Sequence, residues 1–598
     1  MRSPGKNGDA CHECLVAFGM ESASLETSLV QLCMDAAAPD APPAELVPVR
    51  KGWRREVWVL VAMLVVLAAP WLLKPKESTA PASYDRRLVI LTPHHEKIRQ
   101  EFALAFTRYW REKTGQVVYI DWRTGGTAEL AMLLRSEYGG AFQHYWTRTL
   151  KKDWSHEVGL AYANSKLKST DESAAGVARR AFMESNVGIG IDLFFGGGSF
   201  DFEQQASAGI LVAADPSGKF GLKPLREKHP DWFTDEVIPP SVSGEPFYDQ
   251  EMRWVGTCLS SLGICYNSDV LKRLGVEKAP TQWADLADPR LIGQVALSDP
   301  NKSGTVTKSL EQLIQQQMQL RLEELTKDPA TFSTEETRLK AALEQGWERG
   351  LRLIQRVSAN ARYFTDSATK IPLEVCQGDS AAGMCIDFYG RSFEEQVRKA
   401  DGSTRIHFVA PVGGSSIGVD PVAMLRGAPD PELAMAFMEF VLTPEGQKLW
   451  NYQPGTAGGP QEAALRRLPV RRDFYTAENQ ALMTDAGLLP FEQAKLFTYR
   501  PEWTGSLFGA VRFLVKVMCI HVHADQQRAW KAIIAADFPP RAVAAFEDVS
   551  LVNYEATKRL AADLGKKDKE LEMRLTREMT QRFRRHYELA YQLAKEGK

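Results

Sequence analysis

The sequence lacks any concentrated block of positive charge. Its 598 residues carry 73 Lys and Arg against 75 Asp and Glu, which gives a formal net charge of -2. A protein that neutralises nucleic-acid phosphates needs a concentrated basic surface, and no stretch of the chain offers one. The composition therefore argues against a nucleic-acid partner. The length predicts several domains rather than a single core.

Motifs of two common enzyme classes are also missing. The chain has neither an HExxH zinc motif nor a Walker phosphate-binding loop, so no nucleophile stands beside a plausible base in such a motif. We therefore predict no enzymatic activity and no resident cofactor. An enzyme stays open as an alternative, because a fold does not fix a function.

Long hydrophobic runs are absent except for one. Residues 57–73, VWVLVAMLVVLAAPWLL, carry no charge and at about 1.5 Å per residue just span a hydrocarbon core of roughly 30 Å. We predict a transmembrane anchor here, and a signal peptide cut after Ala80-Pro81-Ala82 is the alternative. The preceding residues 1–50 are polar, show no periodic core pattern and are predicted to be disordered.

Cysteines are few, with eight in the whole chain. Cys11 and Cys14 form a CHEC motif, but no second pair completes a tetrahedral metal site. Cys376 and Cys385 flank the turn at Gly378 and could meet, so they are the predicted disulfide. An odd number of cysteines follows the apolar run, which leaves at least one without an intramolecular partner: Cys258, Cys265, Cys376, Cys385 and Cys519.

Strands, polar loops and helices alternate from residue 86 onward. Strands are expected at Arg87–Leu91, at Gln116–Trp122 and at Ile189–Phe195, with an amphipathic helix after the first at about 96–113. This is the βαβ pattern of a parallel sheet, whose ligands lie at the carboxyl ends of the strands. Such ends supply these candidate ligand-binding residues: His94, His95, Arg123, Thr124, Gly126, Thr127, Gly197 and Gly198.

The stretch from Arg253 to Thr305 organises the rest of the chain. We expect a strand over Trp254–Tyr266, a helix capped by Asn267 or Ser268, a strand over 294–297 and a helix that begins at about Thr305. The polar loop before that helix leaves free backbone N–H groups, which suit an anionic ligand. The candidates there are Ser303, Gly304 and Thr305.

This stretch resembles the extracellular solute-binding proteins of bacterial ABC importers, in the family that includes ferric-ion and phosphonate binders. The similar motifs are WVGTCLSSLGICYNSDVLKRLG and WADLADPRLIGQVALSDPNKSGT, together with IDLFFGGG from Ile191, GDSAAGMCIDFYG from Gly378 and GAPDPELAMAFMEFVLTPEGQ from Gly427. The resemblance covers roughly residues 86–472.

The family fold is α/β with two lobes, like the type II periplasmic binding proteins. The resemblance implies that residues 86–254 with 412–472 form lobe 1 and that residues 255–411 form lobe 2. Residues 473–598 lie beyond it and are predicted to form a mostly helical C-terminal extension. We expect the Gln- and Glu-rich helical sequence between Leu310 and Ile354 to present a solvated face.

The resemblance also bears on the ligand. In ferric-binding relatives two adjacent tyrosines ligate the metal, whereas this chain has Phe388 and Tyr389 after Asp387. If the transported ligand is Fe³⁺, Tyr389 and His94 are its candidate ligands. The other loops are richer in hydroxyls, N–H groups and a guanidinium, which suit a phosphonate, phosphate ester or carboxylate. Asp387 and Tyr389 complete the predicted ligand-binding residues.

The predicted function is therefore the solute-binding component of an ABC importer, anchored in the inner membrane by one helix with its bulk in the periplasm. Its partners would be a small-molecule or ion ligand and the ABC permease subunits. Closure of the two lobes traps the ligand by a hinge motion and needs no covalent chemistry. The alternatives are a ligand sensor that signals through the C-terminal helices and an enzyme on the same fold.

Overall fold

The computed structural model describes residues 83–597 except 169, 328–331, 333 and 567, and before them only Trp58 and residues 61–64. These earlier residues are helical. The chain separates into a unit of residues 1–79 and a larger unit of residues 80–598. Most of the predicted anchor, the predicted disordered segment and the CHEC motif lie outside the described residues.

The first half of the large unit is built on parallel strands, as predicted. Strand β1 (Arg86–Thr92) pairs in parallel with β2 (Val118–Thr124) and with β3 (Leu193–Phe195), and helix α2 (Glu96–Thr114) connects the first two. Strand β12 (Ile417–Leu425) runs antiparallel beside β3 and extends the sheet to β7. Strand β3 is shorter than predicted, because residues 189–192 are irregular. Asp192, the last of these residues, is nevertheless fully buried.

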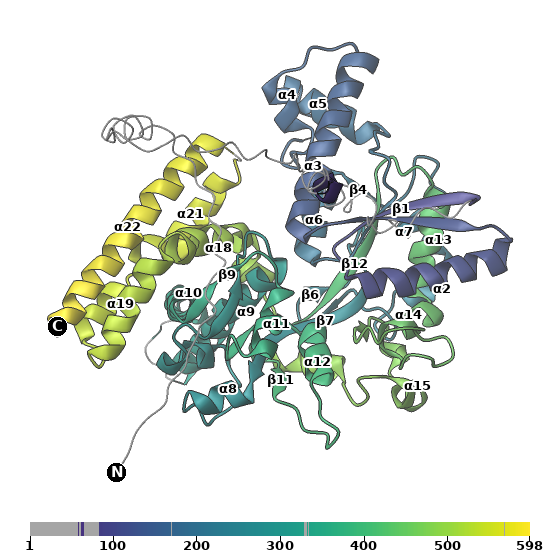
Figure 1. Ribbon diagram of the computed structural model, residues 1–598. Coiled ribbons are helices and arrows are strands. Elements are labelled where there is room, and N and C mark those ends of the chain that lie inside the picture. Colours follow the sequence, from purple (N-terminus) through teal and green to yellow (C-terminus); the bar gives the residue numbers. More distant parts are fainter. Residues whose placement is uncertain are drawn as a thin grey trace, which may run out of the picture. The chain divides into compact units, whose positions relative to one another are not determined.

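The second half has its own strand set. Strands β8 (Val295–Ser298), β9 (Ala361–Thr365) and β10 (Ala382–Ile386) are parallel neighbours, and β11 (Ile406–Val409) pairs antiparallel with β7. Two long antiparallel helices, α9 (Gly304–Thr326) and α10 (Glu335–Ala359), cover this half (Figure 1). The remaining helices of this half are α8 (Ser268–Arg273), α11 (Lys370–Gln377) and α12 (Asp387–Gln396).

Strand β7 (Val255–Asn267) belongs to both halves. Its residues up to Ser261 pair with β12, and those from Leu262 onward pair with β10. The hydrophobic side chains divide at the same point into two cores, one ending at Leu259 on this strand and the other starting at Leu262. The expected strand over Trp254–Tyr266 is thus confirmed, and it is the continuous link between the two cores.

The C-terminal helices pack on the second core. The chain crosses back from Ala494 in the first core to Trp503 in the second. Helix α22 (Lys569–Lys595) lies beside α19 (His523–Ala535) and α20 (Pro540–Phe546), with Phe583 and Tyr587 fully buried (Figure 1). Preceding them are α17 (Pro501–Thr504), α18 (Phe508–Val515) and, before α22, α21 (Tyr554–Leu564).

Other helices cover the first half. After α3 (Thr127–His144) come α4 (His156–Ala161) and α5 (Ala174–Glu184), and after β3 comes α6 (Ser199–Ala208). Strand β4 (Leu211–Val212) pairs with β12, and β5 (Ser241–Val242) pairs with β6 (Glu245–Pro246). The rest are α7 (Leu222–Lys228), α13 (Pro431–Leu442), α14 (Pro444–Asn451), β13 (Leu468–Pro469), α15 (Ala477–Leu482) and α16 (Pro490–Gln493).

The expected solvated face is wrong for the first half of α9. Glu311, Gln312 and Gln315 are almost completely buried. They are buried because other parts of the chain satisfy them: Gln312 donates to the Ser416 hydroxyl at 2.5 Å, and Gln315 donates to the Thr504 hydroxyl at 2.7 Å. A polar helix surface here is an internal contact between segments far apart in sequence.

Among the described residues, one helical stretch is long and apolar enough to cross a membrane, Pro501–Ile520. Two-thirds of its most apolar part is buried inside the protein. Val511, Leu514 and Val517 belong to the second core, so this stretch has a place in the packed fold.

Candidate functional site

A cleft of about 940 Å³ opens between the two halves. The first half contributes the loops that follow β1 and β3 and the starts of α3 and α6. The second half contributes the starts of α9 and α12, and the C-terminal segment from Tyr499 to Lys516 forms a further wall. The cleft thus collects strand ends and helix starts, as expected for a ligand site in an α/β fold.

Eight of the predicted ligand-binding residues line this cleft. They come from five separate segments, each a loop or the first turn of a helix: His94, His95, Thr127, Gly197, Gly198, Gly304, Thr305 and Tyr389. A Cβ atom at Gly196 or at Gly197 would lie under 3.0 Å from His94 or Thr127, and both glycines have positive φ. The glycines therefore allow the loops after β1, β2 and β3 to approach one another closely.

The other predicted residues do not line the cleft. Arg123 has a side chain that is 55% exposed and pairs with Asp121 at 3.0 Å, while Thr124 is exposed on the same strand end. The backbone N–H of Gly126 donates to the Glu129 carboxylate at 3.1 Å, so it is already occupied.

Ser303 and Asp387 serve the framework behind the cleft. The Ser303 hydroxyl caps α9 by accepting from the Val306 N–H at 3.2 Å. Asp387 is 1% exposed and accepts from the backbone N–H of Phe388 at 2.7 Å and from Arg391 at 3.2 Å. Neither residue lines the cleft, but each bonds to the first turn of a helix that does.

Arg467 is the cation that sequence reasoning missed. It lines the cleft but is only 1% exposed, and its Nη2 lies 2.6 Å from Asp420 Oδ2. Within the part of the chain that the structure describes, its Nε–H has no hydrogen-bond partner. Burial opposes its charge, but the carboxylates of Asp420 and Asp387 outweigh this effect and raise its pKa, so it stays protonated.

Two predicted residues lie in the electrostatic field of this guanidinium. Burial, assisted by the charge of Arg467, lowers the pKa of His94 well below 6.5, so its imidazole is neutral near pH 7. Burial raises the pKa of Tyr389 to about 12 although Arg467 opposes that shift, so its phenol keeps its proton. Among the described residues, the Nε2 atom of His94 also has no hydrogen-bond partner. The imidazole and the phenol near Arg467 are therefore both neutral, and the carboxylate of Asp420 is paired with the guanidinium.

A second polar network forms the wall near α9. Lys308 Nζ lies 3.0 Å from Glu245 Oε1 and 3.1 Å from Glu311 Oε2, above the ring of Tyr499. Tyr499 in turn donates to Glu311 at 2.9 Å, while its backbone N–H donates to the Ser243 carbonyl. This network ties the β5–β6 hairpin, α9 and the C-terminal segment together.

One motif of hydrolases is present but has a structural role here. Gly414-Ser415-Ser416-Ile417-Gly418 has the GxSxG spacing and leads into β12. The Ser416 hydroxyl donates to Glu245 at 2.6 Å and accepts from Gln312 at 2.5 Å. Neither partner is a histidine base, and the segment is a loop entering a strand, so the nucleophile elbow of α/β-hydrolases is not formed.

The predicted disulfide is corrected by the structure. Cys376 and Cys385 are both free thiols, as are Cys258, Cys265 and Cys519. Cys376 lies near the end of α11, whereas Cys385 on β10 interacts with Cys265 on the adjacent strand β7. The turn at Gly378 leads from helix to strand, and the two side chains do not meet to form a bond. Among the described residues no group of three or more His, Cys, Asp and Glu side chains could hold a metal ion.

Residues 231–476 match the family of bacterial extracellular solute-binding proteins. This region belongs to that family. It contains β7, Tyr389 and Arg467 and so includes the centre of the cleft. A curated relative, an uncharacterized protein of Haemophilus influenzae, is 23% identical over 258 residues. That alignment covers 43% of this chain and 60% of the relative, so the chain spans under two-thirds of that protein.

Solved structures of solute-binding proteins are also similar to the chain. AfuA from Actinobacillus pleuropneumoniae, a periplasmic binding protein with exogenous fructose-6-phosphate bound, is 18% identical with a TM-score of 0.39. That comparison covers 61% of this chain and 81% of AfuA. Iron-bound HitA from Pseudomonas aeruginosa is 16% identical with a TM-score of 0.41, over 72% of this chain and 98% of HitA. The family match agrees with the α/β fold expected from the sequence motifs.

Proposed function

We propose that the protein is the solute-binding component of an ABC importer and that it captures a small anion in the cleft. The observation that carries this proposal is the buried Arg467, which lines the cleft with an N–H that lacks a partner among the described residues. A buried guanidinium with an open donor is costly unless an acceptor arrives, and an anionic ligand supplies that acceptor.

Capture requires the two halves to close on the ligand. The two hydrophobic cores meet at β7, and the chain crosses between them again between β11 and β12 and between Ala494 and Trp503. We assign residues 86–254 with 412–472 to one lobe and 255–411 to the other, as the motifs suggest, with the change of core inside β7 between Leu259 and Leu262. A hinge at these crossings would trap the solute and present it to a permease. The predicted anchor at residues 57–73 would hold the protein at the inner membrane, facing the periplasm.

Titration calorimetry with two arginine variants tests the anion proposal. The Arg467→Gln substitution should weaken binding of phosphate and carboxylate ligands by about 1.5–3 kcal/mol, the range for a hydrogen bond to a charged group. Arg123→Gln is the matched control, because that guanidinium is exposed and bonded to Asp121. Equal effects of both substitutions would refute the role of Arg467.

Fe³⁺ is the second candidate solute, because Tyr389 and His94 both line the cleft. Here the two ligand classes predict opposite results for Tyr389→Phe. For an anion, the loss is about 1 kcal/mol, as for one neutral hydrogen bond. For Fe³⁺, the same change removes a metal ligand and its charge-transfer colour. The cation of Arg467 and the protonated phenol favour the anion.

A further inference from the structure

Asp201 carries a buried carboxylate that suggests a second contact with the solute. It lies in the first turn of α6, lines the cleft and is 5% exposed. In the described chain its side chain forms no hydrogen bond and no ion pair. A carboxylate accepts hydrogen bonds and cannot donate them, so a group that satisfies it must bring a proton donor.

Arg512 faces the same space from the C-terminal wall. Its Nε donates to the Thr307 hydroxyl at 3.1 Å, and its guanidinium packs over the ring of Phe508. Its Nη2 is buried and has no partner in the described chain. Phe508 also stacks on Phe200, the residue before Asp201, with ring centroids 4.2 Å apart. These contacts fix the position of the guanidinium relative to α6.

The two charged groups flank one point at the start of α9. A Cβ atom on Gly304 would lie 3.7 Å from Asp201 Oδ2 and 3.9 Å from Arg512 Nη2. The absence of a side chain at Gly304 leaves this point open, and in the described chain no ion pair joins Asp201 to Arg512. Arg135 also lines the cleft and donates to Gln204 at 2.6 Å, while its Nε is buried without a hydrogen-bond partner in the described chain. At Gly304, Asp201 supplies an acceptor and Arg512 supplies a donor that face a common gap.

We infer that Asp201 and Arg512 form a second subsite that binds hydroxyl groups of the solute, so that the transported anion is a hydroxylated one, such as a sugar phosphate or a sugar acid. This inference rests on the proposed function. A hydroxyl group donates its O–H to a carboxylate, and its oxygen accepts from a guanidinium, with donor–acceptor distances of about 2.7–3.0 Å. A second anionic group would be repelled by Asp201, and an ammonium group would be repelled by Arg512. Both residues lie outside the family match at residues 231–476, so the subsite is supplied by parts of this chain that the match does not include.

The test uses the full-length protein and pairs of ligands that differ only in hydroxyl groups. Titration calorimetry compares glucose 6-phosphate with tetrahydropyran-2-ylmethyl phosphate, glycerol 3-phosphate with propyl phosphate, and gluconate with hexanoate. The wild-type protein should prefer the hydroxylated member of at least one pair by about tenfold or more, given the cost of leaving buried polar groups unpaired. Asp201→Asn and Arg512→Gln should each remove that preference while the hydroxyl-free ligand binds within about twofold of wild type.

Glu227→Gln, at an exposed position on α7, is the control and should keep the preference. Asp201→Asn changes little volume, so it decides the question if Arg512→Gln folds poorly. Retention of the full preference in Asp201→Asn would overturn the subsite, as would a wild-type protein that binds both members of every pair equally. Those outcomes leave the anion site intact. If no member of any pair binds, the proposed function fails and this inference fails with it.

Discussion

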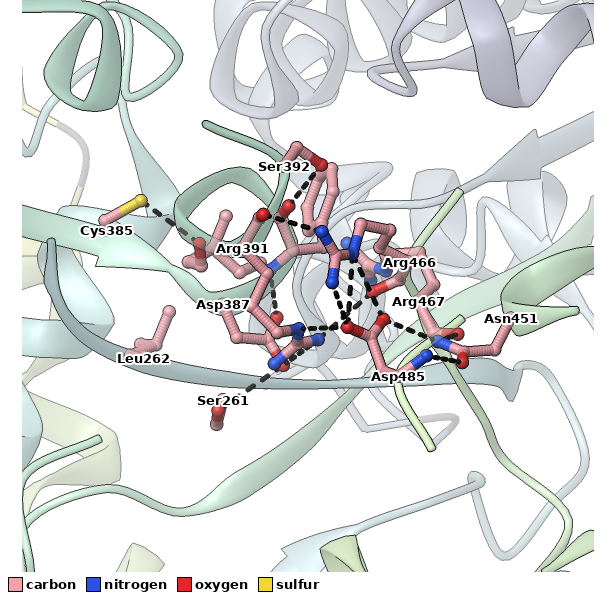
Figure 2. A network of polar contacts seen from close by, with 12 residues as sticks. Ser261, Leu262, Cys385, Asp387, Arg391, Ser392, Asn451, Arg466, Arg467 and Asp485 are labelled. Atoms are coloured by element: carbon pink, nitrogen blue, oxygen red, sulfur yellow. Dashed lines mark hydrogen bonds and ion pairs between the residues drawn. The ribbon is translucent and has the colours of Figure 1, made fainter. Parts of the chain in front are cut away.

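Arg391 of α12 and Arg466, just before β13, exchange hydrogen bonds. Arg391 Nη2 donates to the Arg466 carbonyl at 3.1 Å, and Arg466 Nη1 donates to the Arg391 carbonyl at 2.7 Å. Figure 2 shows Asp485 beside both, where it accepts from Arg466 Nη2 at 2.6 Å and lies 3.5 Å from Arg391 Nε. This network joins α12 to the segment that carries Arg467.

Arg466 also determines where its neighbour points. Its φ is 56°, a left-handed conformation that costs a non-glycine residue about 1–2 kcal/mol. The hydrogen bonds to Asp485 and Arg391 offset that strain, and the adjacent Arg467 faces the cleft. The position of the proposed anion anchor thus depends on a buried ion network below it.

Removing the central carboxylate should therefore destabilise the fold. Asp485→Asn leaves two guanidiniums, each on a side chain only 13% exposed, without their shared charged partner, and we expect a loss of about 2–3 kcal/mol in the free energy of unfolding because Arg391 keeps its ion pair with Asp387. Urea unfolding measures this loss. Asp379→Asn is the control, because Asp379 pairs with Arg362 at 3.1 Å and the two side chains are 50% and 43% exposed. That variant should lose under about 1 kcal/mol, and equal losses would contradict the role of the network.

The thiols give a second prediction. Cys376 is half-buried, whereas Cys258, Cys265, Cys385 and Cys519 are buried. A thiol-alkylating reagent should label Cys376 in the folded protein and the other four only after denaturation. Peptide mapping without reduction identifies the labelled sites. Recovery of a peptide pair bridged between Cys376 and Cys385 would contradict the structure.

Protonation of His523 should make stability depend on pH. His523 opens α19, lies 3.1 Å from the Ser358 carbonyl and packs edge-on against Phe364. Burial lowers its pKa below 6.5, although the hydrogen bonds to the Ser358 and Ala361 carbonyls oppose the shift. The unfolded chain therefore binds more protons than the native state just below that value, so the stability is fully present above pH 6.5 and falls as the pH decreases.

Urea unfolding between pH 7 and pH 5 measures this dependence. His523→Gln should make the decrease in stability shallower than in the wild-type protein. Some slope should remain, because burial also lowers the pKa of His94, His95 and His521. His156→Gln, at an exposed position on α4, should leave the slope unchanged. An identical slope in His523→Gln would show that this histidine is not the titrating group.

The anchor prediction concerns solubility. The described core residues begin at Leu88, and the chain before residue 80 is a separate unit. A chain that begins at Ser83 should be soluble without detergent and should bind the same ligands as the full-length protein. Light scattering and calorimetry check both properties. Aggregation in every buffer would mean that the apolar segment is part of the packed fold.

Local sequence patterns were sufficient for much of the fold. The continuous apolar run of β1, the amphipathic face of α2 and the Asn267 cap of α8 are short-range signals, and each predicted its element within about two residues. Seven of the eight predicted residues that line the cleft follow from one rule, because ligands of α/β folds lie at the carboxyl ends of strands, whereas Tyr389 was predicted from the family motif.

The residues that sequence reasoning missed depend on long-range contacts. Arg467 follows a stretch with no periodic pattern, and distant partners hold it: its backbone bonds to Trp450 and Asn451, and its guanidinium pairs with Asp420. Arg512 belongs to an apolar helix whose place against α6 is set by Phe200 and Phe508. The burial of Glu311 could not be expected either, because its partners Tyr499 and Thr504 are almost two hundred positions away.

A native mass spectrum of the full-length protein, purified from its own host, tests the central claim most directly. The account predicts a bound small organic anion in the wild-type protein and its loss in Arg467→Gln, while Arg123→Gln keeps it. Fragmentation of the released ligand should show hydroxyl groups. A mass increase that corresponds to a bound ferric ion, retained when Arg467 is replaced and lost in Tyr389→Phe, would contradict the account.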